Sequence, residues 1–548
     1  MEAISENSSL KGDAAKRANL EGAEYHRQGK LPEAEACYRH ALELNPDFPE
    51  ALNNLGSISR GKGQFAVAER CLRKALSLKP DYPQALNNLG NLLGELNRLS
   101  EAENSYREAL RLKPDYVEAY VNLGNLLRQL DKIAEAEQCY LTAINLNPDM
   151  LEAHANICNL FEKTNQTEKL RDFLSNITAD QYARHPGLTI SNANLLRHEK
   201  KYQEALALIK KINLASIANT ALTIEVLALM GDLADRLGNH EEAFEYFKES
   251  KKRAAINYER IGADKSKFLN GAKAIADQLA VRGSTSRETS VSKPVRLAFM
   301  VGFPRSGTTL LDSILRGHPE VEVIEEKPML ARTLEEAGRQ ESANPGFFAQ
   351  IDDAQIAGLR EIYLDEMKKF CGSNNQDKLI IDKLPLNLIY GGFIHRLFPE
   401  ARFILVLRDP RDCVLSCFMQ DFRANDAMAN FLTLEDAAGF YDFVMRLWKR
   451  DNDLLTLPVV EVRYENLVTE LEASVRPLLD FLGLPWNDAV IRFQETALKR
   501  NQIKTPSYHQ VVQPIYQNAK GRWNNYKNQM ERVIPVLAPW IKEFGYEN

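Results

Sequence analysis

The chain has 548 residues, too many for a single hydrophobic core, so more than one domain is expected. Hydrophobic residues make up 44% of the sequence and charged residues 26%, a balance typical of folded proteins that excludes global disorder. The formal net charge of −6 gives no indication of a nucleic-acid partner. Because no window resembles a secretory signal or a membrane-spanning helix, we expect a cytoplasmic protein without a membrane partner.

The first half of the chain repeats itself, since a Pro-Asp pair and a separate alanine each recur every 34 residues. The repeated positions are Pro46, Pro80, Pro114 and Pro148, and Ala34, Ala68, Ala102 and Ala136. This pattern resembles the tetratricopeptide repeat, in which each unit is a pair of packed helices. The period degrades after about residue 161 but keeps several of its positions, so we expect an α-helical repeat solenoid over residues 1–280.

A row of asparagines lies on the expected first helix of successive repeats, directly before a Leu-Gly pair. The row consists of Asn54, Asn88 and Asn122. In tetratricopeptide proteins this helix lines the concave face, and amides can hydrogen-bond the backbone of an extended chain without reading its side chains. These residues are therefore predicted to bind a protein or another extended acceptor. The alternative is that asparagine is merely frequent at this position and is solvated.

A polar segment, residues 281–294, is predicted to be a linker. After it the spacing of the hydrophobic residues no longer follows the 34-residue repeat. Short apolar runs then alternate with helical stretches, which predicts an α/β three-layer domain with a mainly parallel sheet over residues 295–548. The expected strands are residues 297–301, 321–324, 379–382, 403–407 and 459–462. The oligomeric state is not indicated by any of these patterns.

The first expected strand leads into the sequence GFPRSGTT, residues 302–309, which has the spacing of a phosphate-binding loop. Thr308 stands where loops that bind nucleoside triphosphates carry lysine, which disfavours a P-loop kinase. A strand, a glycine-rich loop and a helix start still direct backbone N–H groups at an anion. The loop is therefore predicted to hold an anion other than a nucleoside triphosphate.

Charged residues follow four of the expected strands. Arg305 follows the first, Glu325 and Glu326 the second, Lys383 the third and Arg408 the fourth. Ligands of open α/β sheets bind at the carboxyl ends of the strands. These charges are therefore expected to meet in one site.

From about residue 294 onward the chain resembles the sulfotransferases that use 3′-phosphoadenosine-5′-phosphosulfate (PAPS). FPRSGTTLLDSILRGHP is similar to their 5′-phosphosulfate loop, and RDPRDCVLSCF to their 3′-phosphate motif. With its repeats the whole chain resembles the bacterial tetratricopeptide-repeat sulfotransferases, and its catalytic half is closer to tyrosylprotein sulfotransferase than to the small-molecule enzymes. The resemblance implies transfer of a sulfuryl group to an acceptor hydroxyl, of protein tyrosine or of an extended glycan. The transferred group carries less charge than a γ-phosphoryl group, so no metal ion is expected.

The resemblance implies two anion sites for the two ends of the donor, and a C-terminal loop that closes over the nucleotide. Helix starts and loop amides suit the phosphosulfate, and the planar guanidinium of arginine suits the 3′-phosphate. The implied donor-binding residues are Arg305, Ser306, Gly307, Thr308, Thr309, Arg408, Ser416, Tyr464, Gln510 and Arg522.

Catalytic roles follow from the same resemblance. Glu326 is implied as the general base that takes the proton of the acceptor hydroxyl. Its neighbour Glu325 is an alternative candidate for that role, and His509 is a less favoured candidate. Charge on the leaving phosphate oxygen would be stabilised by a set of three residues. This set is Arg305, Lys383 and Ser507.

Two positions depart from the tyrosylprotein pattern. Gln420 stands where that enzyme has a further 3′-phosphate arginine, and Pro328 where it has a substrate-contacting arginine. Arg332 keeps the second substrate position and is therefore implied in substrate binding. The alternative to an enzyme is a non-catalytic scaffold, in which the repeats bind a partner and the second domain is a relic.

Overall fold

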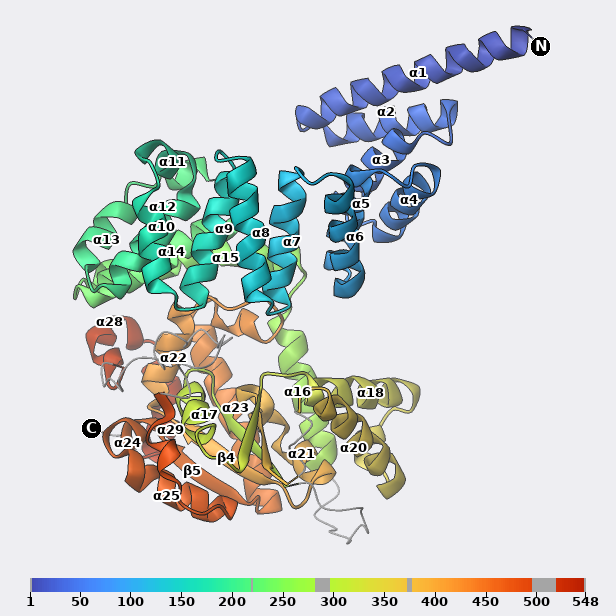
Figure 1. The fold of residues 1–548 in the computed structure, drawn as a ribbon. Coiled ribbons are helices and arrows are strands. Elements are labelled where there is room, and N and C mark those ends of the chain that lie inside the picture. Colours follow the sequence, from blue (N-terminus) through green and yellow to red (C-terminus); the bar gives the residue numbers. More distant parts are fainter. Residues whose placement is uncertain (1, 218–219, 281–295, 372–376, 495–518, 547–548) are drawn as a thin grey trace. The chain divides into compact units, whose positions relative to one another are not determined.

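The computed structural model describes residues 2–217, 220–280, 296–371, 377–494 and 519–546 (Figure 1). The chain forms two compact units, one up to residue 201 and one from residue 202 onward. The predicted linker, residues 281–294, and several C-terminal site residues lie outside the described part. The domain boundaries drawn from the sequence therefore stay a prediction.

The first unit consists of helices that pack in antiparallel pairs. They are α1 (Glu2–Arg27), α2 (Leu31–Leu44), α3 (Pro49–Gly61), α4 (Phe65–Leu78), α5 (Pro83–Glu95), α6 (Leu99–Leu112), α7 (Val117–Gln129), α8 (Ile133–Leu146), α9 (Leu151–Lys163), α10 (Thr167–Ser175), α11 (Ala179–Arg184) and α12 (Pro186–His198). The 34-residue alanines are fully buried. A Cβ at Gly90 would lie 2.6 Å from the Tyr106 ring, so only glycine allows α5 and α6 to approach this closely. The predicted helical repeats are confirmed.

The second unit begins with four more helices and continues into the sheet. The helices are α13 (Tyr202–Ile209), α14 (Thr220–Arg236), α15 (His240–Arg260) and α16 (Lys265–Ala280). The helices α14 and α15 pack as closely as the repeat helices before them. A Cβ at Gly231 would lie 2.7 Å from the Phe247 ring, just as a Cβ at Gly90 would meet Tyr106. The helical region thus extends to residue 280, as predicted.

A five-stranded sheet forms the centre of the second unit, with every neighbouring pair of strands parallel. The strands, in the spatial order β2-β3-β1-β4-β5, are β1 (Leu297–Gly302), β2 (Val321–Glu325), β3 (Leu379–Lys383), β4 (Arg402–Leu407) and β5 (Val459–Arg463). Each lies within a residue or two of its predicted range. Because strand side chains alternate between faces, Phe299 and Leu405 belong to one hydrophobic core and Met300 and Ile404 to another.

Helices cover both faces of this sheet, which confirms the predicted three-layer α/β architecture (Figure 1). On one face lie α17 (Thr308–Leu315), α24 (Tyr464–Thr469) and α25 (Leu471–Leu482). On the other lie α16, α18 (Met329–Ala343), α20 (Asp353–Lys368), α21 (Gly391–Leu397), α22 (Pro410–Met419), α23 (Leu434–Leu455) and α29 (Ile534–Glu543). Among the described residues, no helix combines the length and apolar character that crossing a membrane requires.

Candidate active site

The glycine-rich loop joins the end of β1 to the start of α17, and its backbone is unusual. Gly307 has a φ of 107°, in the region that favours glycine, and a Cβ there would lie 2.6 Å from the Tyr464 ring. Arg305 also has a positive φ, 68°, which is strained for a non-glycine residue. The loop thus packs directly against Tyr464, one of the donor-binding residues that the resemblance implies.

The polar groups of this loop suit an anion. Thr308 and Thr309 form the first turn of α17 and are buried. The Oγ atom of Ser306 is also buried, and no described residue hydrogen-bonds to it. Because a buried hydroxyl without a partner is costly and a helix start attracts negative charge, a bound phosphate or sulfate group would fit here.

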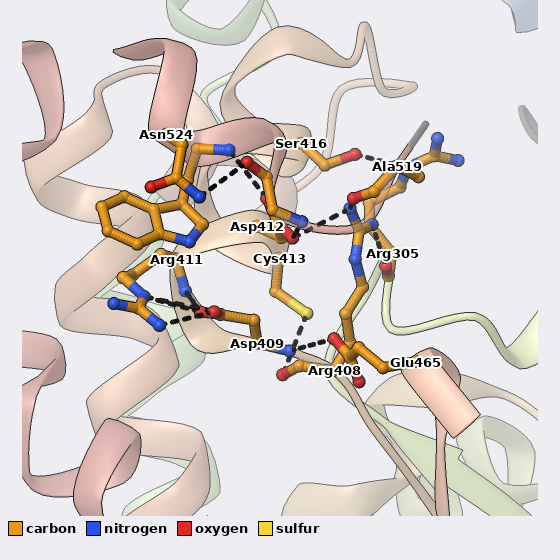
Figure 2. Close-up of polar contacts among 12 residues, drawn as sticks. Arg305, Arg408, Asp409, Arg411, Asp412, Cys413, Ser416, Glu465, Ala519 and Asn524 are labelled. Carbon is orange, nitrogen blue, oxygen red and sulfur yellow. Dashed lines mark hydrogen bonds and ion pairs between the residues drawn. The ribbon is translucent and has the colours of Figure 1, made fainter. Parts of the chain in front are cut away.

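Arg408 follows β4 directly and is only 6% exposed. Its Nη1 donates to the carbonyl of Arg305 (3.1 Å), its Nη2 donates to the carbonyl of Ala519, and Asp412 lies 3.7 Å away as an ion-pair partner (Figure 2). The guanidinium lies 5.0 Å from the centroid of the Tyr464 ring. Burial opposes its charge, but Asp412 and other neighbours raise the pKa of Arg408 above its usual range. Its Nε is buried and has no partner among the described residues.

Ser416 lies on α22, two turns beyond Arg408. Its Oγ accepts a hydrogen bond from Nε of Arg305 (3.1 Å), as Figure 2 shows. Arg305, which belongs to the loop of the first predicted anion site, therefore contacts both residues of the second, Arg408 through its carbonyl and Ser416 through its side chain. The loop after β1 and the helix after β4 are thus brought together, as expected for neighbouring strands of one sheet.

The sequence interpretation missed the role of Asp412 in this site. Its carboxylate, which is 1% exposed, accepts from the backbone N–H groups of Gly521 (2.7 Å) and Trp523 (2.9 Å). Burial raises the pKa of Asp412, although Arg408 opposes that rise. The sequence offered one signal, because Asp412 follows Arg408 by four residues, a spacing at which opposite charges can pair at the start of a helix. The contact of the same carboxylate with residues 521 and 523 could not be predicted from its sequence neighbours, because those residues lie more than 100 positions away.

The three predicted charges after β2 and β3 form one cluster. Lys383 is fully buried, and its Nζ donates to Oε1 of Glu325 (3.2 Å) and to Oε1 of Glu326 (3.0 Å). Burial opposes the ammonium charge, but the two carboxylates outweigh it and raise the pKa of Lys383. The side chain of Glu326 is 42% exposed and that of Glu325 only 10%. Glu326 is therefore the more accessible of the two carboxylates.

Other predicted residues lie apart from this cluster or outside the described residues. Arg332 is exposed on α18 and pairs with Glu335. Arg522 donates to Asp235 of α14, and the segment just before it is held by Arg408 and Asp412. Ser507 and Gln510, like the rival base His509, fall outside the described residues.

The asparagines of the repeats are hydrogen-bonded to one another. Each donates its side-chain N–H to an asparagine 35 residues earlier: Asn54 to Asn19 (3.0 Å), Asn88 to Asn53 (2.8 Å) and Asn122 to Asn87 (2.9 Å). This amide ladder links neighbouring repeats, a structural role that the sequence interpretation did not anticipate. An amide has two N–H groups and an oxygen, so capacity for a bound chain remains.

Comparisons with known proteins agree with these features. Residues 298–488 match the model of a sulfotransferase family, and models of the tetratricopeptide repeat match residues 22–59, 47–115, 87–150 and 224–257. Protein-tyrosine sulfotransferase 1 of Danio rerio is 29% identical over 277 residues, 47% of this chain and 74% of the fish protein. Protein-tyrosine sulfotransferase 2 of Gallus gallus is 27% identical, over 50% of this chain and 75% of the chicken protein.

A bacterial relative, an uncharacterized protein of Aquifex aeolicus, is 28% identical over 280 residues. This alignment covers 49% of the present chain but only 35% of the Aquifex protein, so the two share one region rather than their whole lengths. The match to the sulfotransferase family contains β2 to β5, all of β1 except Leu297, and every charged residue of the cluster described above. The chain therefore combines tetratricopeptide repeats with a domain of the sulfotransferase family.

Proposed function

We propose that the chain transfers a sulfuryl group from PAPS to an acceptor hydroxyl. The observation that supports this most directly is the meeting of two anion-binding elements, the loop after β1 and the start of α22 after Arg408. Ser306 Oγ and Arg408 Nε are both buried there without a partner among the described residues. An anionic ligand that spans both elements would satisfy both atoms.

In this proposal each end of PAPS has its own set of residues. The loop residues 306–309 and the start of α17 would hold the 5′-phosphosulfate, while Arg408 and Ser416 would hold the 3′-phosphate. Tyr464 packs against both Gly307 and Arg408, which suits an aromatic contact to the base between the two ends. The residues present therefore fit the donor, with Arg305 as the shared element.

The proposed reaction is an in-line displacement at sulfur. The acceptor oxygen forms a bond to sulfur, the bond from sulfur to the bridging phosphate oxygen breaks, and its electron pair stays on the leaving adenosine 3′,5′-bisphosphate. Glu326 takes the proton of the acceptor hydroxyl. Arg305 and Lys383 would stabilise the charge on the leaving oxygen, and no metal ion is required. Lys383 has the additional role of holding the Glu326 carboxylate in place.

Protein tyrosine is the acceptor class that we propose first, because several relatives are named protein-tyrosine sulfotransferases. The tetratricopeptide repeats would present such an acceptor, or an extended glycan, as an extended chain. A cytoplasmic location belongs to the same proposal. The alternative hypothesis is that the protein is a scaffold without catalytic activity.

Binding of adenosine 3′,5′-bisphosphate, the product of the donor, tests the proposed site. It should raise the melting temperature of the protein, since a ligand that binds only the native state stabilises it. Arg408→Gln should abolish this stabilisation. Arg402→Gln is the matched control, because Arg402 lies at the opposite end of the same strand and stacks on Phe481. No stabilisation of the wild type at saturating nucleotide would overturn the proposal.

A second experiment identifies the acceptor. The protein is incubated with ³⁵S-labelled PAPS and a lysate of its source organism, and the label is then traced to protein, polysaccharide or small molecules. Label in protein supports the tyrosine proposal, and label in polysaccharide supports the glycan. Binding of the nucleotide without any transfer would instead indicate the scaffold.

A further inference from the structure

Arg522, the predicted donor residue nearest the C-terminus, is held by the last helical repeat. Its Nη2 donates to Oδ2 of Asp235 (2.7 Å), which is the residue before the last of α14. The two residues are 287 positions apart in the sequence. The repeat matched at residues 224–257 contains Asp235 and includes most of α14 and α15. An ion pair thus connects a repeat helix to a residue that the resemblance assigns to the donor site.

The Asp235 carboxylate is held by more than this arginine. Its Oδ1 accepts from the hydroxyl of Tyr526, which is itself fully buried, and lies 3.2 Å from Nδ1 of His240. The side chain of Asp235 is only 13% exposed. Three groups from two segments therefore fix the carboxylate, which makes it a rigid partner rather than a surface charge.

The segment that carries Arg522, residues 519–526, is anchored on its other side by α22. Asp412 accepts from the backbone N–H groups of Gly521 and Trp523, and Arg408 donates to the carbonyl of Ala519. The segment thus lies between the helix that carries Ser416 and the repeat helix α14. Within it, Nε of Arg522 is buried and has no partner among the described residues.

We propose that Asp235 is a positioning residue for the donor, so that the last repeat is part of the donor-binding site. This inference rests on the proposed function. An arginine side chain that is already held in one rotamer loses less conformational entropy when it binds a phosphate. Asp235 engages Nη2, and Nε of Arg522, which has no partner among the described residues, would be the atom that meets an anion. The repeat helices from α14 onward therefore contribute to donor affinity as well as to any acceptor contacts.

Asp235→Asn tests this inference, because it removes the charge and keeps the shape of the side chain. We expect the affinity for adenosine 3′,5′-bisphosphate, measured by calorimetry on the full chain, to fall about tenfold. The KM for PAPS should rise by the same factor while kcat changes less than about twofold. Asp232→Asn is the control, since Asp232 lies on the same helix and pairs with Arg236 instead.

A double-mutant cycle separates this role from a merely structural one. If Asp235 acts through Arg522, then Asp235→Asn should have no further effect on nucleotide affinity in the Arg522→Gln background. An equal loss in both backgrounds would overturn the inference, as would unchanged or tighter binding by Asp235→Asn alone. Should Asp235→Asn fail to fold, Asp235→Glu keeps the charge but displaces it, and a similar loss is expected. A wild type that binds no nucleotide would overturn the proposed function itself, which is a different result.

Discussion

The repeats and the sheet domain keep their charges in different places. In the repeats, ion pairs lie at the surface: the side chains of Arg107, Glu103 and Glu135, which pair across two repeats, are 47%, 14% and 51% exposed. In the sheet domain, Lys383 and Arg408 are 0% and 6% exposed. These charged residues of the repeats are therefore in contact with water, whereas Lys383 and Arg408 of the sheet domain are shielded from it.

This difference shows which charges serve stability and which serve a ligand. An exposed pair contributes about 1 kcal/mol or less, and salt screens it. A buried charge costs several kcal/mol of desolvation, so its retention indicates a role that an apolar residue could not take. Substitutions of buried charges should therefore change function or pH dependence, whereas substitutions of the exposed ion pairs in the repeats should have only small effects on stability.

The largest expected effect is that of Glu326→Gln. Loss of a general base lowers the rate of transfer about a thousandfold, while the affinity for adenosine 3′,5′-bisphosphate stays the same. Glu325→Gln is the matched control, because it removes the neighbouring carboxylate that is turned inward, and its rate should fall less than about tenfold. The comparison uses initial rates with labelled PAPS. An equal loss in the two variants would contradict the assignment of the base.

The second prediction concerns Asp382, which is buried beside Lys383 and accepts a hydrogen bond from Tyr363 (2.7 Å). Burial raises its pKa from 3.8 to about 7, so the folded protein binds this proton more tightly than the unfolded chain does. The contribution of Asp382 to stability is therefore greatest at acid pH and is lost as the pH rises through about 7, by about 3 kcal/mol between pH 4.5 and 8. Asp382→Asn should remove this loss.

Urea unfolding followed by tryptophan fluorescence measures this effect, because all four tryptophans lie in the second unit. Asp365→Asn is the control, since Asp365 is exposed on α20 and pairs with Lys368. It should keep the pH dependence of the wild type. The prediction fails if Asp382→Asn has the same pH profile as the wild type.

A third prediction breaks the packing of the repeats without touching a charge. A Cβ at Gly124 would lie 2.6 Å from the buried Tyr140 ring, so Gly124→Ala should destabilise the repeats by about 2 kcal/mol. Gly94→Ala is the matched case, because no atom lies within 4 Å of a Cβ there and the helix should gain about 0.5 kcal/mol. Circular dichroism during thermal unfolding of the full chain measures both. Equal shifts would show that the helices are not packed this closely.

The smallest expected effect sharpens the interpretation of the amide ladder. Asn122→Ala removes the hydrogen bond to Asn87 and should cost about 1 kcal/mol. Asn156 holds the matching position one repeat later, 34 residues after Asn122. Asn156→Ala should cost less, because its Nδ2 has no partner among the described residues and Val121 occupies the position 35 residues earlier. The same circular dichroism experiment compares the two. Equal losses would mean that the ladder does not stabilise the repeats.

Much of the fold was predictable because its signals are local. The 34-residue recurrence predicted the helix pairs, and five apolar runs predicted the five strands within a residue or two. The loop of residues 302–309 was recognisable because a phosphate-binding turn needs glycine where φ is positive, as at Gly307. Arg305 and Arg408 each come shortly after the end of a strand. Their meeting in one site was predictable, because the carboxyl ends of parallel strands lie at the same edge of the sheet.

Partners of the charged residues were not predictable in this way. The sequence by itself determined the element types, the repeat period and the residues that end each strand, because these depend on neighbours a few positions apart. Only the tertiary structure decided that Lys383 lies between Glu325 and Glu326, and that Asp235 holds Arg522. The physical reason is that such pairs form between segments far apart in the chain, where packing alone determines which charge is buried beside which.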